Sequence, residues 1–139
     1  MSIKLFDDTS IAMSRKLALN YSTSFSLGIR LLSKDSRWAV FSIYGLVRVA
    51  DEIVDTFHGY NKEKMLLDFK AQTYQAMEEG ISSNPVLHAF QLAANQFGIG
   101  QDLIEPFFQS MEEDLDTRTH NAKSYSQYIY GSAEVVGLM

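Results

Sequence analysis

The sequence contains no cysteine, and this absence excludes a disulfide framework and any chemistry that depends on a thiolate. Only two prolines are present, which favours long, uninterrupted helices over a turn-rich β-sheet protein. The chain also lacks any uncharged apolar run of about 18 residues, so we expect no membrane-spanning helix. Its N-terminus, MSIKLFDDTS, lacks the basic and then apolar pattern of a signal peptide. These absences suit a cytoplasmic protein and leave attachment to a membrane surface open.

The overall charge is mildly acidic, with a formal net charge of −5 at pH 7. Such a balance provides no general attraction to DNA or RNA, so we expect no nucleic-acid partner. Hydrophobic residues make up 46% of the chain and charged residues 21%, both close to the averages of globular proteins. A chain of 139 residues therefore suits one domain of ordinary size with a single core.

Apolar periodicity and capping residues predict helices nearly throughout the chain, and hence an all-α fold. Pro85 suits the first position of its helix, whereas Pro106 should either kink its helix or start the main part of it. The expected helices run from Thr9 or Ser10 to Leu19, from Ser22 to Leu32, from Ser33 as N-cap to near His58, from Asn61 as cap to Gly80, from Asn84 as cap to Gly98, and from Gln101 to Thr117.

The C-terminal segment, SYSQYIYGSAEVVGLM, reads as a mostly apolar helix that ends without a cap, a basic last turn or a polar tail. Natural chains rarely end inside a buried element. We therefore expect the polypeptide to continue beyond residue 139 in its parent protein. The alternative is a short C-terminal core helix.

The segment RVADEIVD brings four charged residues to the end of the apolar run WAVFSIYGLV. On a helix, Tyr44, Arg48, Asp51 and Asp55 follow 4-3-4 spacing and share one face, which we call the polar stripe. Most other directions of this helix are apolar, so the helix should be buried. Because isolated buried charges are unfavourable, the polar stripe should line an internal cleft. The main apolar face consists of Val40, Ile43, Val47, Ala50 and Val54.

The two aspartates of the polar stripe lie one helical turn apart. Such a like-charge pair is destabilising, the more so inside a cleft, unless a cation lies between the two carboxylates. Mg²⁺ suits hard oxygen ligands and commonly binds one or two protein carboxylates together with substrate phosphate oxygens. Arg48 could then bind a phosphate or pair with a carboxylate. The alternative is an ordinary solvated face with an Arg48–Glu52 or Arg48–Asp51 ion pair. The spacing suggests a carboxylate–metal–phosphate site without naming a reaction.

Four segments together resemble the squalene/phytoene synthase family, from about residue 15 to 139. In order, they are YSTSFSLGIRLL, WAVFSIYGLVRVADEIVD, MEEDLDTR and YIYGSAEVVG. The resemblance implies an isoprenoid synthase-type helical bundle around a central cavity, with residues 1–139 as the N-terminal half of a single domain. It also implies head-to-head joining of two allylic diphosphates through a cyclopropylcarbinyl diphosphate, with Mg²⁺ bound by aspartate-rich motifs on facing helices.

The resemblance assigns roles to individual residues. It implies that Asp51 and Asp55 bind the diphosphate through Mg²⁺, or Mn²⁺ in its place. It also implies that Tyr44, Arg48 and Tyr128 belong to the same catalytic site. Further residues are assigned to contacts with the substrate or to the cavity wall. These are Ser22, Ser24, Phe25, Asp114, Ala133, Val136 and Gly137.

The family most closely suggested is a bacterial phytoene synthase, which converts geranylgeranyl diphosphate to phytoene. Formation of squalene or dehydrosqualene is the close alternative, and NADPH would be needed only if the product is squalene. A head-to-tail prenyl diphosphate synthase and a non-catalytic assembly or interaction module remain further alternatives. The expected partners are prenyl diphosphate substrates, with other enzymes of isoprenoid biosynthesis as further candidates.

Two other features bear on function. No second D-x-x-x-D follows Tyr128, although the family needs such a pair on a later helix to complete its Mg²⁺ cluster. We therefore expect the 139-residue chain alone to have little or no synthase activity. Asp55 and His58 have the carboxylate–histidine spacing of di-iron bundles, but no second such motif is evident. His88 falls on the apolar side of its helix and is expected to be a core or boundary histidine.

Overall fold

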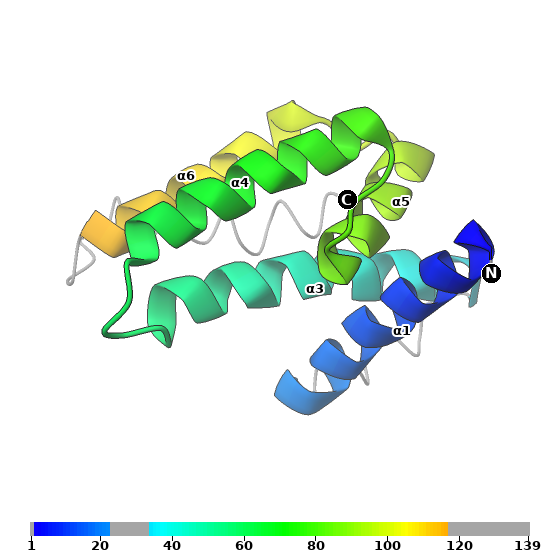
Figure 1. The fold of residues 1–139 in the computed structure, drawn as a ribbon, viewed down its shortest axis with the longest axis horizontal. Helices are drawn as coiled ribbons and strands as arrows, with labels where there is room; N and C mark the ends of the chain where they lie inside the picture. The colour runs from blue at the N-terminus through cyan, green and yellow to red at the C-terminus, as the bar shows by residue number, and fades with distance from the viewer. Residues whose placement is uncertain (1, 23–33, 117–139) are drawn as a thin grey trace.

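The computed structural model describes residues 2–22 and 34–116, and every regular element within these ranges is an α-helix (Figure 1). The predicted all-α fold is therefore confirmed. None of the described helices is long and apolar enough to cross a membrane. The helices are α1 (Ile3–Tyr21), α3 (Lys34–Asp55), α4 (Lys62–Glu79), α5 (Pro85–Phe97) and α6 (Gln101–Asp116).

Helix α3 is the centre of the described structure and contacts each of the other four helices. Helices α4 and α6 lie next to one another on one side of α3, while α1 packs against α3 and α5 (Figure 1). Leu46 and Ala50 of α3 are completely buried, and Ile43, Ile53 and Val54 are nearly so. The apolar nature of this helix thus predicted its central position correctly. The core is completed by fully buried side chains of the neighbouring helices, among them Leu66, Phe90, Phe107, Phe108 and Met111.

The predicted caps of α4 and α5 are confirmed. Asn61 accepts a hydrogen bond from the backbone N–H of Lys64 at 3.2 Å, and Asn84 accepts one from that of Val86 at 3.0 Å. Gly80 and Gly98 end the two helices with φ angles of 72° and 70°. Side chains with a Cβ atom rarely adopt this left-handed conformation, so glycine suits both helix ends.

Two predicted helix boundaries are wrong. Helix α1 begins at Ile3 rather than at Thr9 or Ser10, because Ser2 already caps it by accepting the Leu5 N–H at 3.3 Å. Helix α3 ends at Asp55 rather than near His58, because the backbone N–H groups of Thr56 and Phe57 both donate to the carbonyl of Glu52. Helix α6 runs through Pro106. The helix expected over 22–32, the Ser33 cap, the end at Thr117 and the C-terminal helix lie outside the described residues.

Helices α1 and α3 approach one another closely at Gly45. A Cβ atom added to Gly45 would lie only 2.7 Å from Oγ of Ser14, a fully buried residue of α1. Ser10 and Ala18, on the same face of α1, are also fully buried. This small-residue crossing brings the C-terminal end of α1 to the middle of α3, where the polar stripe begins.

We expect Gly45→Ala to destabilise the chain by about 1 kcal/mol, because the added methyl group overpacks the crossing. The midpoint of urea unfolding, followed by circular dichroism, measures this loss. In a Ser14→Gly background the clashing side chain is gone, so Gly45→Ala should then cost less. Equal losses in both backgrounds would show that the close approach at Gly45 does not limit the packing of α1.

Candidate functional site

The polar stripe lies along the last three turns of α3, as its spacing predicted. Arg48 and Asp51 are half-buried, whereas Asp55, the last residue of the helix, is exposed, so the stripe is less enclosed at this end than the sequence predicted. The carboxyl group of Asp114, from α6, is hydrogen-bonded to that of Asp55. Both aspartates line a pocket of about 660 Å³, together with Lys62 and His58. The fold thus brings Asp114 to the aspartate pair from a different helix.

The electrostatics of these carboxylates reflect their crowding. Burial raises the pKa of Asp51 from 3.8 to about 6; the charge of Arg48 opposes this shift, and the charges of Asp55 and Asp114 add to it. The pKa of Asp55 is also raised, first by burial and then by the charge and hydrogen bond of Asp114. Arg48 and Lys62 are the cations that counteract this. Negative charge therefore exceeds positive charge where α3 and α6 meet.

One carboxylate oxygen of the aspartate pair, Oδ1 of Asp51, lacks a hydrogen-bond partner among the described residues. This oxygen is also buried. A buried carboxylate oxygen without a partner is unfavourable and calls for a cation or a hydrogen-bond donor. Asp51 is therefore the carboxylate of the stripe that most clearly needs a ligand.

Arg48 is held in place from two sides. Its Nη2 donates to Oε1 of Glu52 at 2.7 Å, and its guanidinium carbon lies 4.7 Å from the centre of the Tyr21 ring. The side chains of Arg48 and Glu52 are only 22% and 17% exposed. The Arg48–Glu52 pair considered from the sequence thus exists, but on a mostly buried face rather than a solvated one. Nε of Arg48 is buried without a hydrogen-bond partner in the described part of the chain, so the guanidinium retains a donor for a ligand.

The remaining predicted site residues are placed only in part. Tyr44 is half-buried and packs against Ala18 and Phe41, one turn before Arg48. Ser22 is the C-cap of α1, and its N–H donates to the carbonyl of Ala18 at 2.9 Å. The other predicted residues lie outside the described ranges; they are Ser24, Phe25, Tyr128, Ala133, Val136 and Gly137.

Two site residues were missed in the sequence. Tyr21 contacts Arg48 through its ring face, and it directly precedes Ser22, which the family resemblance had assigned to the substrate or the cavity wall. Lys62 donates from Nζ to the carbonyl of Val54 at 2.7 Å, which places its positive charge at the C-terminal end of α3 beside Asp55. A lysine just after a predicted helix end is a weak signal, and no spacing rule connects Tyr21 with Arg48.

The predicted metal ligands Asp51 and Asp55 do not form a complete metal site with the other described residues. Within residues 2–22 and 34–116, no group of three or more histidine and carboxylate side chains is arranged to hold a metal ion by itself. Asp55 and His58, which have the spacing of a di-iron ligand pair, therefore have no further metal ligands arranged around them within these ranges, and His58 is exposed. His88 is buried, as expected, with Nε2 only 2.6 Å from Oδ1 of Asp7. A cation at Asp51 and Asp55 would therefore need further ligands, such as phosphate oxygens and water.

Comparison with known proteins agrees with this arrangement. Residues 18–139 match the sequence model of the family described as squalene/phytoene synthase. The chain belongs to this family. A 4,4'-diapophytoene synthase from Staphylococcus haemolyticus (strain JCSC1435) is 26% identical over 122 residues, which cover 86% of this chain and 43% of that protein.

A solved structure supports the same fold. The crystal structure of a dehydrosqualene synthase in complex with ligand matches with a TM-score of 0.81 at 22% identity, over 96% of this chain and 46% of that chain. The expected isoprenoid synthase-type helical fold is thereby confirmed. In both comparisons the chain spans less than half the length of its relative.

Proposed function

We propose that this chain carries the first aspartate-rich diphosphate site of an enzyme that joins two allylic prenyl diphosphates head to head. The observation that supports this most strongly is the meeting of Asp55 and Asp114, from two different helices, at a pocket, with Asp51 one turn before Asp55 on α3. Carboxylates that raise each other's pKa form a poor structural element but a suitable site for a cation. Membership of the squalene/phytoene synthase family favours head-to-head over head-to-tail condensation.

The residues present fit a divalent cation bound with a diphosphate. The partnerless oxygen of Asp51 and the carboxylate of Asp55 would hold Mg²⁺, or Mn²⁺ in its place. When bound, the cation supplies charge neutralisation for the diphosphate leaving group. Asp114 adds a third carboxylate from α6. Because carboxylates alone would repel a diphosphate, binding of substrate in this proposal depends on the cation.

Arg48 and Lys62 provide the positive charge of the protein itself. Glu52 and the ring of Tyr21 fix the guanidinium of Arg48, and its Nε donor would hydrogen-bond a phosphate oxygen. Lys62 stands at the edge of the pocket, beside Asp55 and Asp114. Val54 and Leu115 line the same pocket, and such apolar side chains would keep water away from an allylic cation formed on ionisation.

The choice of product is a further part of the proposal. The two relatives named above are a 4,4'-diapophytoene synthase and a dehydrosqualene synthase, so we propose a dehydrosqualene-type product first. Phytoene from geranylgeranyl diphosphate, the first expectation from the sequence, is the second candidate. NADPH enters only if the product is squalene.

Binding of a prenyl thiodiphosphate, whose sulfur-bridged leaving group ionises poorly, tests the proposed site. Isothermal titration of the 139-residue chain should show affinity for this analogue with Mg²⁺ and little affinity without it. The matching prenyl alcohol, which lacks the diphosphate, serves as the control and should not respond to Mg²⁺. Equal affinity for the analogue with and without the cation would refute the proposed function.

A further inference from the structure

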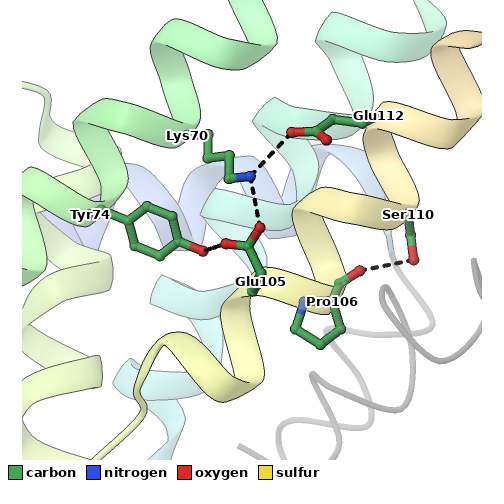
Figure 2. A network of polar contacts seen from close by, with 6 residues as sticks. All are labelled: Lys70, Tyr74, Glu105, Pro106, Ser110 and Glu112. Carbon is green, nitrogen blue, oxygen red and sulfur yellow. Dashed lines mark hydrogen bonds and ion pairs between the residues drawn. The ribbon is translucent and has the colours of Figure 1, made fainter.

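Helices α4 and α6 are joined by a polar network centred on Lys70 (Figure 2). Nζ of Lys70 lies 2.9 Å from Oε1 of Glu105 and 3.2 Å from Oε1 of Glu112. The hydroxyl of Tyr74, one turn further along α4, donates to the other carboxylate oxygen of Glu105. The side chain of Lys70 is only 20% exposed, whereas those of Glu105 and Glu112 are 50% and 36% exposed, so solvent screens these ion pairs in part. We call these four residues the α4–α6 clamp.

Lys70 contacts α6 at two residues that lie two helical turns apart. Glu105 and Glu112 are separated by seven residues, which corresponds to about 10 Å along the helix axis. A rotation of α6, or a slide by one turn, would break both contacts with the same lysine. Apolar contacts also bury α6, and they include an edge-to-face contact between the rings of Phe108 and Phe69 of α4, with 6.3 Å between the ring centres. The clamp adds to this packing two ion pairs with fixed partners, which oppose both rotation and sliding of α6.

The opposite side of α6 carries the contact with the candidate site. Asp114 follows Glu112 by two residues, which places it roughly 200° further around the helix. Consistent with this, Glu112 contacts α4 whereas Asp114 contacts Asp55 of α3. The contact of Asp114 with Asp55 brings two carboxyl groups together, with Asp51 nearby, and the charge of Asp114 raises the pKa of both aspartates of α3. The position of α6 therefore decides whether Asp114 lies at the candidate site.

We propose that Lys70 is a positioning residue that holds α6 in the register in which Asp114 lies beside Asp55 at the diphosphate site. The role of Lys70 at that site rests on the proposed function, whereas its hold on α6 is a property of the fold. Lys70 itself does not line the pocket of Asp55 and Asp114. Its effect on a ligand must therefore pass through α6.

Chemical crosslinking tests the hold on α6 without any ligand. His58 and Leu115 line the same pocket from the two sides, and the chain has no cysteine of its own. His58→Cys with Leu115→Cys therefore provides a single thiol pair and leaves every carboxylate in place. With a short thiol-to-thiol reagent, Lys70→Met should slow crosslinking several-fold. Lys64→Met is the matched control, since within the described part of the chain Lys64 pairs with Asp68 of its own helix and with no residue of α6. Equal rates in the Lys70→Met and Lys64→Met proteins would overturn the proposal.

Mg²⁺-dependent affinity for the thiodiphosphate analogue tests the consequence for the site. Lys70→Met should weaken it roughly tenfold, the scale of losing a residue that supports metal ligands. Lys70→Arg should retain most of it, and Lys64→Met should leave it unchanged. In an Asp114→Asn background, Lys70→Met should have no further effect; independent, additive losses would overturn the role at the site.

The two measurements separate the two proposals. A parent chain without any Mg²⁺-dependent affinity refutes the proposed function, while the crosslinking rates still decide whether Lys70 holds α6. Thermal melting of each variant accompanies both tests. Should Lys70→Met unfold, Tyr74→Phe removes one arm of the clamp and should give a smaller loss in the same direction in both measurements. An unchanged crosslinking rate in a folded Tyr74→Phe would count against the clamp.

Discussion

Replacing Asp51 and Asp55 together by asparagine should abolish the Mg²⁺-dependent part of the affinity for a prenyl thiodiphosphate. Both carboxylates would be direct ligands of the cation, so the loss should exceed the roughly 10- to 100-fold typical of a residue that only supports a metal site. Asparagine keeps the size of each side chain and removes its charge. Isothermal titration at pH 7.5, with and without Mg²⁺, measures the change.

The control for this double variant is Asp8→Asn with Asp68→Asn. It changes the net charge by the same amount, at two exposed aspartates that each pair with a lysine on their own helix. This control should keep the Mg²⁺-dependent affinity of the parent chain. If the Asp51/Asp55 variant kept that affinity as well, the role given to the polar stripe would be wrong.

Helical periodicity accounts for what could be predicted at this site. Residues on one helix face are related by the 3.6-residue repeat, so the common face of Arg48, Asp51 and Asp55 follows from the sequence alone. The caps Asn61 and Asn84 are equally local, since each bonds backbone groups within three residues. The beginning of α1 was missed although Ser2 is also a local cap, because the acidic and polar stretch after it hides the helix pattern.

Contacts between helices could not be predicted in this way. Nothing in the spacing of Asp55 and Asp114 indicates that they touch, and only resemblance to a family marked Asp114 at all. The same holds for the ring of Tyr21 under Arg48 and for Lys70, whose two partners lie 35 and 42 residues away. These contacts depend on how α1, α4 and α6 pack around α3, and the sequence of one helix does not contain that information.

The raised pKa of Asp51 leads to a prediction about stability. An acid whose pKa rises from 3.8 to about 6 on folding binds its proton more tightly in the folded state. Stability should therefore fall as the pH rises from about 4 to 6, and the loss should be complete above that range. Each pKa unit corresponds to about 1.4 kcal/mol, so the full shift sets an upper bound of roughly 3 kcal/mol. Partial solvent exposure of Asp51 reduces the expected loss to about 2 kcal/mol.

Asp51→Asn should consequently stabilise the chain at pH 7.5 by about 2 kcal/mol, because the amide is never charged. Its advantage should shrink below pH 6 and vanish below about pH 3, where Asp51 is protonated in both states. Urea unfolding at several pH values measures this. The exposed Asp35, in the first turn of the same helix, provides the control, since Asp35→Asn should bring no such gain.

A variant that is more stable but no longer binds the diphosphate analogue with Mg²⁺ would be a direct sign of function. Asp51 faces Arg48, Glu52, Asp55 and Asp114, and the single arginine does not compensate for three carboxylates. An aspartate beside three other carboxylates lowers the stability of the fold, so stability does not explain its presence at this position. Binding of a cation does explain it, because a cation needs several carboxylates close together. Equal or lower stability of Asp51→Asn at pH 7.5 would mean that the described residues already satisfy this carboxylate. The need for a cation at the polar stripe would then disappear.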